Sequence, residues 1–580
     1  MSAKITPRLA LRALNDSRKV DPLAYLSLRY TLASVTSLKN VWARTTAPEI
    51  VRRRPGPGFL ESKLFKQLDQ DGDPEFRDVV RSGGPEALAE VALLDACSKA
   101  GKAFQPADEV YSYHFAKRSS VEGAFIPYFE LFSARQAKIG EVCEKRPKDW
   151  VLYADIKQFY PSITQTRAFK AWERACDESK LSSDWREFGR LLLNRQFSLK
   201  KGLLVGPSFS HLIANLVLRD LDREMAKEFP GRYFRYVDDF AFIVPPDRKQ
   251  ETTSFLRAHL KPLGLRLHPK KIHWMGAAKW RQNAPYQFAG DYDDEPIGDE
   301  DWMHFIDHVK CYLMARPKMR DRVRTVFLEA GLRVPLPRYT AETMSKSYTD
   351  RFSIRLASQH FTEKIEKLSP KELVKEGLRL REAYAKQFDF AWERFTSSKG
   401  PIRKWKLSKV RYLVGRMLLI GSLDQVKVIL GMISAEPEVA EYTAMLAALL
   451  TGNAEELLRF GWKVAASAGQ ALAAASIPAS CKPVEWTEVQ VEAYTALLLA
   501  GVAVDVKLPK RLKGNLRIET VAGGRPTKAW AEMPYSFYRE MSALMGKGRI
   551  ENHRVLLQSP ADPDERWEVF ADELLGLEPT

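Results

Sequence analysis

Residues 233–244 carry the sequence Tyr-Phe-Arg-Tyr-Val-Asp-Asp-Phe-Ala-Phe-Ile-Val, in which two adjacent acidic residues stand between two runs of aromatic and aliphatic residues. Such runs are typical of β-strands, and the very short connection between them predicts a hairpin. Asp238 and Asp239 would then lie at the tip of this hairpin, at one edge of a sheet. A bare acidic pair is most often only a polar turn, so the neighbouring segments decide its meaning.

A third carboxylate has a similar setting earlier in the chain. Asp155 follows Val-Leu-Tyr-Ala at 151–154 and precedes Ile-Lys-Gln-Phe-Tyr-Pro-Ser-Ile at 156–163. Unpaired carboxylates are costly to bury, because desolvation and like-charge repulsion both disfavour their ionised forms. A divalent cation removes this cost, and hard oxygen ligands favour Mg²⁺, which takes further ligands from water and substrate phosphates.

The first half of the chain has a mixed pattern. Residues 1–100 are expected to be mainly helical, whereas β-rich runs at 150–156, 233–244 and 263–274 alternate with helical segments. This predicts an α+β fold with an antiparallel sheet, because the regular βαβ alternation of a parallel sheet is absent.

After about residue 300 the sequence becomes almost wholly helical. Ser369 and Pro370 predict the N-cap and first turn of a long helix that ends near Gly400. Between 405 and 501, helix-length segments with apolar residues three and four apart are separated by glycine and proline. This pattern indicates either a stacked helical-repeat array or an irregular helical bundle.

Composition and charge narrow the class of protein. The 580 residues are 45% hydrophobic and 28% charged, as in globular proteins of several domains. The net charge of +17 divides into +9 for residues 1–300, +10 for 301–450 and −2 for 451–580. A basic excess confined to the first 450 residues predicts a polyanionic partner there, most simply nucleic acid.

Five scattered cysteines, with no C-x-x-C pair among them, argue against a disulfide framework or a zinc site. No apolar stretch approaches the length of a membrane span, so no membrane association is expected. The prediction is a cytoplasmic protein.

Three blocks together carry a resemblance to a known family. The segments around Asp155, at 202–215 and around Asp238 resemble, in this order, palm motifs A, B and C of reverse transcriptases. The segment 264–271 resembles motif D. The resemblance covers residues 100–290 and implies a right-hand-like arrangement of fingers and palm.

The resemblance also implies the roles of individual residues. Asp155 and Asp238 would hold two catalytic Mg²⁺ ions, Asp239 would be the supporting carboxylate of the metal site, and Lys271 would protonate the departing pyrophosphate. At the incoming nucleotide the resemblance places Ile156, Tyr160, Gly206 and Lys271.

For two of these positions, the residue type explains how it would act on the nucleotide. Tyr160 matches the aromatic residue that rejects a 2′-hydroxyl, which implies synthesis of DNA from deoxynucleoside triphosphates. Gly206 would allow close backbone approach to the nucleotide.

Val205 stands where many templated reverse transcriptases have glutamine, so ordinary handling of the template is in question. Three basic residues are candidates to bind the triphosphate: Lys117, Arg118 and Arg135.

Motif details favour one branch of the family. Val-Tyr-Ser-Tyr at 110–113, the altered block at 202–215 and the helical C-terminal half resemble bacterial antiviral reverse transcriptases, of the abortive-infection type (AbiA- and AbiK-like) or the defence-associated "unknown group". This implies DNA synthesis in anti-phage defence, either protein-primed and template-independent or with a partner non-coding RNA. It also implies homo-oligomers formed through the helical region.

Two alternatives remain open: a conventional RNA-templated reverse transcriptase of retron or intron type, and a catalytically silent scaffold that binds DNA or RNA. The three intact aspartates argue against the scaffold.

The predicted domains are fingers and palm at 1–300, a thumb-like helical segment at 301–400 and a helical repeat-like domain at 401–580. Within the last of these, four successive residues interleave cations with an aromatic ring, which suits phosphate contacts and base stacking. A helix start with a solvated face is the alternative. The four residues are Arg403, Lys404, Trp405 and Lys406.

Overall fold

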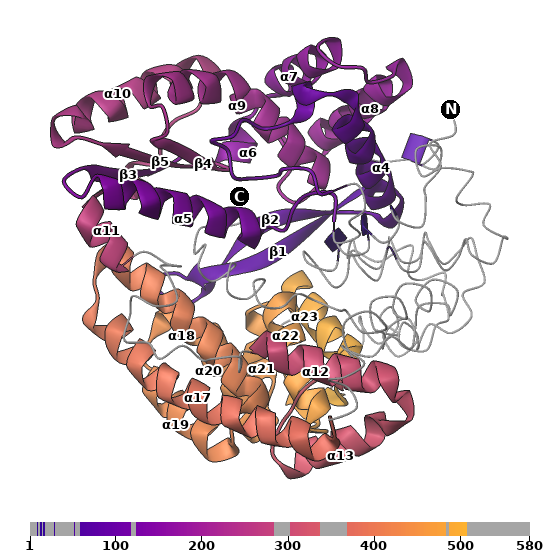
Figure 1. Cartoon of the computed structure of the whole chain (residues 1–580). Coiled ribbons are helices and arrows are strands. Elements are labelled where there is room, and N and C mark those ends of the chain that lie inside the picture. Colours follow the sequence, from indigo (N-terminus) through magenta and orange to yellow (C-terminus); the bar gives the residue numbers. More distant parts are fainter. Residues whose placement is uncertain are drawn as a thin grey trace. The chain divides into compact units, whose positions relative to one another are not determined.

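The computed structural model describes residues 58–117, 123–283, 302–336, 368–482 and 486–506, together with a few residues between 9 and 52 (Figure 1). The chain divides into two compact units, one built mainly from residues 79–292 and the other mainly from residues 293–576. The predicted domain boundaries stay predictions.

A four-stranded sheet forms the centre of the first unit. Its order is β4-β5-β3-β6, and every neighbouring pair is antiparallel. The predicted α+β class with an antiparallel sheet is therefore confirmed. The strands are β3 (Trp150–Asp155), β4 (Tyr233–Tyr236), β5 (Asp239–Val244) and β6 (His273–Gly276).

The prediction of a strand at 263–274 is largely wrong, because only the last residues of this range pair in β6. Two short 3-10 turns, Lys261–Leu263 and Pro269–Lys271, occupy the earlier part. Each contains a proline, which cannot donate a ladder hydrogen bond, and Gly264 between them has a positive φ of 64°.

Helices cover both faces of this sheet. Every residue of β4 and β5 is buried, and Figure 1 shows α9 and α10 on one side of the strands and α5 on the other. The helices of this unit are α4 (Gly84–Ala100), α5 (Tyr128–Lys145), α6 (Phe159–Ser162), α7 (Gln165–Asp177), α8 (Ser183–Leu199), α9 (Ser208–Glu228), α10 (Lys249–Leu260) and α11 (Ala277–Asn283).

A β-hairpin replaces part of the helical structure expected for residues 1–100. Strands β1 (Phe59–Leu68) and β2 (Pro74–Ser82) pair in a two-stranded sheet. Asp69 closes the connection, because its Oδ1 accepts hydrogen bonds from the backbone N–H groups of Asp71 and Asp73, each at 2.9 Å. Side-chain bonding to a nearby backbone favours a turn over a helix.

The base of this hairpin packs on the loop before α9. The N–H of Val80 donates to the carbonyl of Val205 at 2.8 Å, and Phe59, Val80 and Leu204 form an apolar cluster. Gly206 has φ +121°, and a Cβ there would lie 2.1 Å from the Val80 carbonyl oxygen. The close approach that requires this glycine is therefore to the hairpin backbone.

The second unit is mostly helical, as predicted. Ser369 caps α17 by accepting a hydrogen bond from the N–H of Glu372, also as predicted. Its elements are α12 (Trp302–Ala315), α13 (Arg320–Glu329), α17 (Pro370–Ser397), α18 (Gly400–Ile420), α19 (Leu423–Ile433), α20 (Ala440–Thr451), α21 (Glu455–Arg459), α22 (Trp462–Ala474), β7 (Ala479–Cys481), α23 (Glu488–Leu499) and β8 (Val504–Val506).

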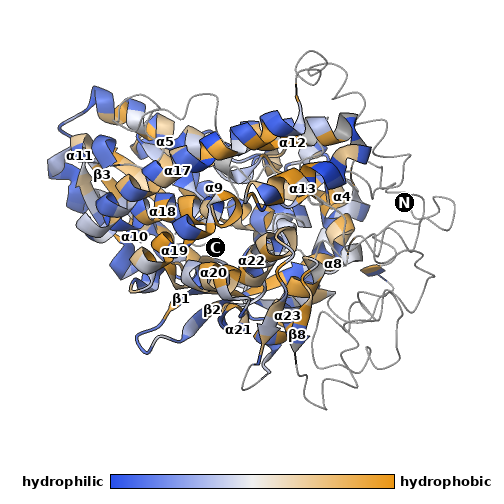
Figure 2. Cartoon of the chain, turned by 90° about the horizontal axis from the view of Figure 1, so that it is seen from below, coloured by the Kyte–Doolittle hydropathy of each residue, from blue (hydrophilic) through white to orange (hydrophobic). Residues whose placement is uncertain are grey.

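Neighbouring helices of this unit pack in pairs, α17 with α18, α19 with α20 and α22 with α23. Figure 2 shows hydrophilic and hydrophobic residues interleaved along α17. Its buried residues recur at helical spacing, including Leu373, Leu380, Tyr384 and Phe388. Of the helices that the structure describes, none combines the length and the apolar content that a membrane span needs.

We predict that Gly206→Ala destabilises the first unit more than a positive φ alone explains. The matched control is Gly101→Ala, where φ is +128° but nothing lies within 4 Å of a Cβ. The control should lower the free energy of unfolding by about 1–2 kcal/mol, because alanine is strained in a left-handed backbone. Gly206→Ala should lower it by about 1–3 kcal/mol more, because the new Cβ displaces β2. Thermal and urea unfolding measure both, and equal losses would contradict the packing described here.

Candidate active site

Three carboxylates meet at one edge of the sheet. Asp155, the last residue of β3, lies directly opposite Asp239, the first residue of β5. Asp238 lies in the two-residue turn between β4 and β5, and its carbonyl accepts a hydrogen bond from the N–H of Ile156 at 3.2 Å. All three aspartates are no more than 7% exposed. The predicted hairpin and the convergence of its acidic residues with Asp155 are thus present.

The turn that carries Asp238 has a strained backbone. Val237 has φ +53°, a conformation that costs a β-branched residue about 1–3 kcal/mol. Two contacts hold it: the N–H of Val237 donates to Ser112 Oγ at 3.0 Å, and its carbonyl accepts from Arg235 Nη1 at 2.6 Å. The orientation of Asp238 is therefore fixed by neighbours on both sides of Val237.

Arg235 is a site residue that sequence reasoning missed. It is fully buried, and its guanidinium donates two hydrogen bonds of 2.7 Å to Asp222 of α9 and one of 3.2 Å to Asn215 Oδ1. The signal was an arginine inside an otherwise aromatic strand, because such a charge needs a buried acidic partner. The arginine couples the hairpin turn to α9.

Burial and repulsion shift the acidity of the site. Burial, followed by the charges of Asp155 and Asp239, raises the pKa of Asp238 well above its usual range. Burial also raises the pKa of Asp239, while Arg135 acts in the opposite direction. Both shifts have the sign that burial and like-charge repulsion give to a carboxylate.

Arg135 is held inside the protein. This residue of α5 is fully buried, with Nη1 2.9 Å from Asp239 Oδ2 and Nη2 donating to the Asp239 carbonyl at 3.1 Å. It is therefore an internal partner of Asp239, and triphosphate binding by this candidate stays a prediction. Of the other candidates, Lys117 is exposed and Arg118 lies outside the described residues.

The motif D segment lies beside Asp155. Lys271 Nζ is 2.8 Å from Asp155 Oδ2, and the N–H of His268 donates to the Asp155 carbonyl at 2.7 Å. The Lys271 side chain is 30% exposed, so its ammonium group is next to the carboxylates and accessible to solvent. Proton donation by Lys271 stays a prediction.

Tyr160 is anchored in α6, one turn after β3. Its ring is buried, and its hydroxyl lies 2.6 Å from Nδ1 of His211 on α9. The imidazole stacks on Tyr113 with ring centroids 4.1 Å apart. Burial lowers the pKa of His211 to about 3, so this imidazole is neutral. No pattern in the sequence indicates His211, because only the fold brings it next to Tyr160.

Two other residues expected to contact the nucleotide, Ile156 and Gly206, have contacts within the protein. Ile156 is buried, and its N–H is bonded to Asp238, while Gly206 lies against Val80. Nucleotide binding by either residue stays a prediction.

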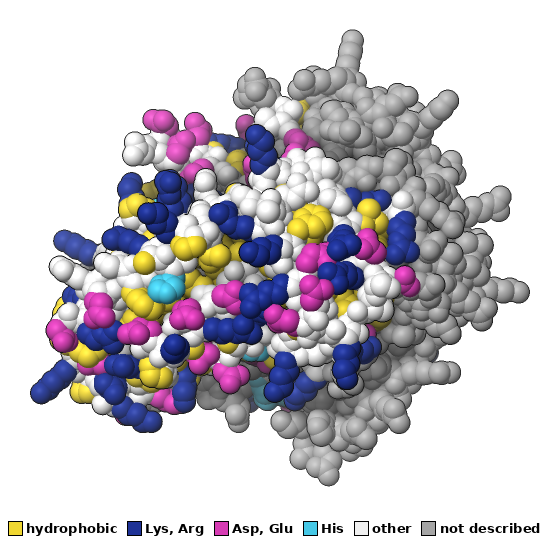
Figure 3. All heavy atoms as spheres, turned by 90° about the horizontal axis from the view of Figure 1, so that it is seen from above, with side chains coloured by type: hydrophobic (Ala, Val, Ile, Leu, Met, Phe, Trp, Pro, Cys, Tyr) yellow, Lys and Arg dark blue, Asp and Glu magenta, His cyan; other side chains and the backbone are white. Residues whose placement is uncertain are grey.

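The face of the molecule drawn in Figure 3 carries charges of both signs on its described residues. Figure 3 shows basic and acidic side chains interspersed over the described residues of one face, without a continuous basic stripe. Ion pairs of α7, α8, α9 and α10 neutralise many of the basic groups, among them Arg174–Glu178, Arg186–Asp177, Arg219–Glu178 and Arg248–Glu228.

The predicted basic patch in α18 is only partly available to a ligand. Arg403 is paired with Glu436 at 2.6 Å and Glu438 at 2.7 Å, and it lies over the Phe395 ring at 3.9 Å. Its charge is therefore balanced within the helical unit. Lys404 is exposed, whereas Trp405 and Lys406 are half-buried. Nucleic-acid binding by this patch stays a prediction.

One comparison with known proteins, the match to a family model, covers the residues of this site. Residues 98–290 match the family described as reverse transcriptase (RNA-dependent DNA polymerase). This range contains all three aspartates. Residues 98–290 are a reverse transcriptase domain. The chain therefore carries the catalytic domain of an RNA-directed DNA polymerase, an enzyme class that binds nucleic-acid template and deoxynucleotides and generally uses divalent metal ions.

Similar solved structures include two telomerases. One is the telomerase of Candida albicans in complex with a fragment of telomeric RNA, at 11% identity and TM-score 0.28, with 66% of this chain and 67% of that chain covered. The other is the apo telomerase of Candida tropicalis, also at 11% and 0.28, with 79% and 74% covered. A likeness this low supports no conclusion about function. No curated protein matches the sequence.

We predict that Asp238→Asn stabilises the reverse transcriptase domain when divalent ions are absent. The raised pKa means that the neutral carboxyl stabilises the fold at low pH, and this stability is lost as the pH rises above the ordinary aspartate value of 3.8. The variant should therefore lose less stability on going to pH 8 and melt about 2–4 °C higher there, which corresponds to about 1 kcal/mol.

Melting curves in EDTA across this pH range measure the effect. The control is Asp247→Asn, an exposed residue just beyond β5 that should change neither midpoint nor slope. An Asp238→Asn variant with the wild-type pH dependence would contradict the electrostatic account.

Proposed function

We propose that this chain synthesises DNA with two Mg²⁺ ions held by Asp155 and Asp238. The observation that supports the proposal most is the convergence of three nearly buried carboxylates at one sheet edge, within a reverse transcriptase domain. The donor atoms that face each other there are carboxylate oxygens, the hard ligands that Mg²⁺ prefers. The residues present thus fit the ions.

When bound, the ions lower the pKa of the attacking hydroxyl and stabilise the triphosphate and the leaving pyrophosphate. The protein's own residues do the rest. Asp155 would provide an oxygen ligand from the end of β3, and Asp238 would provide one from the β4–β5 turn. Asp239, held by Arg135, supports the hairpin and the negative potential of the site. Lys271, already beside Asp155, supplies a proton to the pyrophosphate.

Tyr160 is proposed as the group that selects deoxynucleotides. Its ring is fixed by the bond to His211 and by burial, so it is a rigid obstacle rather than a mobile side chain. A fixed aromatic surface close to the sugar excludes a 2′-hydroxyl by steric clash.

The narrower proposal is anti-phage defence. It rests on the altered block at 202–215, the Tyr-Ser-Tyr motif ending at Tyr113 and the large helical unit, not on the comparisons. Within this block, Leu204 and Gly206 pack against the base of the β1–β2 hairpin, at Phe59 and Val80. DNA synthesis primed on a tyrosine hydroxyl, or directed by a partner non-coding RNA, and homo-oligomers belong to the same proposal.

We predict that the purified full-length chain incorporates labelled deoxynucleotides in Mg²⁺ and that Asp155→Asn and Asp238→Asn each reduce incorporation by at least about 10³-fold, because each removes a metal ligand. The assay has three arms: an added primer–RNA template, co-purified RNA retained, and nuclease-treated protein alone. Activity confined to the first arm favours the conventional templated enzyme, and activity in the third favours protein priming. Asp247→Asn is the control with wild-type activity.

The same variants test the biological role. If the chain acts in defence through DNA synthesis, cells expressing Asp238→Asn lose protection in phage plaque assays while those expressing Asp247→Asn keep it. Full protection by the Asp238→Asn variant would instead support the non-catalytic scaffold.

We predict that Tyr160→Ala raises the ratio of ribonucleotide to deoxynucleotide incorporation by about 100-fold, because the obstacle to the 2′-hydroxyl is removed. Tyr160→Phe is the matched control: it keeps the ring, loses the bond to His211 and should keep wild-type sugar discrimination. The ratio is measured within each variant, so partial unfolding does not affect it. An unchanged ratio in Tyr160→Ala would refute the role.

A further inference from the structure

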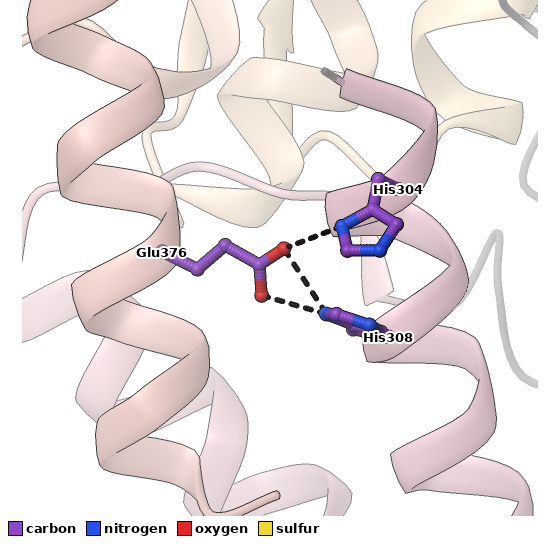
Figure 4. Close-up of side chains that lie close together, drawn as sticks. All are labelled: His304, His308 and Glu376. Carbon is purple, nitrogen blue, oxygen red and sulfur yellow. Dashed lines mark hydrogen bonds and ion pairs between the residues drawn. The ribbon is translucent and has the colours of Figure 1, made fainter. Parts of the chain in front are cut away.

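A second cluster of metal-ligating side chains lies in the helical unit, away from the aspartates in sequence and chemistry. His304 and His308 are four residues apart on α12, and both imidazoles face the Glu376 carboxylate of α17 (Figure 4). Nδ1 of His308 is 2.9 and 3.1 Å from the two carboxylate oxygens, and Nδ1 of His304 is 3.5 Å from one of them. Residues at i and i+4 share one face of a helix, so both rings reach the same point.

The burial of Glu376 is not explained by an ordinary ion pair. Its side chain is 9% exposed, and within the described part of the chain its partners are only these two imidazoles. A buried carboxylate without a lysine or arginine is costly, because a neutral imidazole returns only part of the lost hydration energy. A divalent cation between the three groups would remove this cost.

The spacing of the ligand atoms fits a small tetrahedral ion. Bonds of about 2.0–2.1 Å at the tetrahedral angle separate neighbouring ligand atoms by about 3.3 Å. The measured separations of 2.9–3.5 Å between imidazole nitrogens and carboxylate oxygens bracket this value. The three candidate ligand atoms all lie within 4.8 Å of one another.

We propose that His304, His308 and Glu376 bind a zinc ion, with a fourth position left for water or another ligand. Two imidazoles and one carboxylate form a known zinc ligand set, and nitrogen donors disfavour Mg²⁺. His304 is 37% exposed while His308 is 16% exposed, so the ion has a route from solvent on the His304 side.

The surroundings indicate a clamp rather than a hydrolytic centre. In helical zinc hydrolases of the H-E-x-x-H type, a glutamate follows the first histidine and acts as the base. Here that position is Phe305, which is buried among aromatic neighbours. A metal at this site would instead join α12 to α17 and so stabilise the packing of the helical unit.

The sequence argued against a zinc site because its cysteines lack ligand spacing. The pair His304 and His308 was visible at helical spacing, but Glu376 follows His308 by 68 residues. Only the packing of α12 on α17 brings the third ligand into place.

The test measures zinc binding by the full-length chain after its metals have been removed. Isothermal titration calorimetry is carried out in excess Mg²⁺, so that Mg²⁺ saturates the aspartate site. The proposal predicts one zinc equivalent and a rise of the melting midpoint on zinc addition. Substituting Co²⁺ should give the visible absorption of tetrahedral coordination. His304→Ala, the more exposed ligand, should weaken binding by more than about 100-fold, beyond the loss typical of outer-shell changes.

The matched control is His259→Ala, which removes a half-buried histidine of α10 bonded only to its own helix and should bind zinc as wild type does. Glu376→Gln separates the two readings of the cluster. If the carboxylate is a ligand, the variant loses the zinc-induced rise in melting midpoint. If the cluster is only a hydrogen-bonded contact between helices, wild type shows no such rise, and the proposal is overturned; unchanged zinc affinity in His304→Ala overturns it as well. Neither readout depends on polymerase activity.

Discussion

The catalytic account depends on the antiparallel pairing of β3 with β5, which sets Asp155 opposite Asp239. Side chains alternate between the faces of a sheet, so a slip of one residue would move every side chain of β5 to the other face and separate the carboxylates. Both faces of β5 are buried, so hydrogen bonds on both sides of Asp155 help to hold this register. The N–H of His268 donates to the Asp155 carbonyl, and the N–H of Ile156 donates to the Asp238 carbonyl.

Two buried arginines hold this edge of the sheet in place. Arg135 pairs with Asp239, and Arg235 pairs with Asp222 and holds the carbonyl of the strained Val237. Removing one partner of such a buried pair typically costs about 3–5 kcal/mol, because the other charge is left uncompensated. The positive charge of Arg135 thus offsets part of the repulsion between the carboxylates, because it pairs with Asp239.

Local patterns predicted the local parts of this structure. The acidic hairpin, the end of β3 and the Ser369 cap were legible because each depends on residues close in sequence. The β1–β2 hairpin was not, since its packing partner is the loop at 202–206. The partners of Arg135 and of His211 are likewise distant in the chain, so the sequence alone could not indicate either contact.

The most direct test of the central claim is a crystal structure of the full-length chain with Mg²⁺ and a non-hydrolysable deoxynucleoside triphosphate. The account predicts two ions at about 2.0–2.1 Å from carboxylate oxygens of Asp155 and Asp238, with the triphosphate bound to them. It also predicts that Asp239 remains bonded to Arg135. Ions bound elsewhere, or a triphosphate without contact to Asp155 and Asp238, would contradict it.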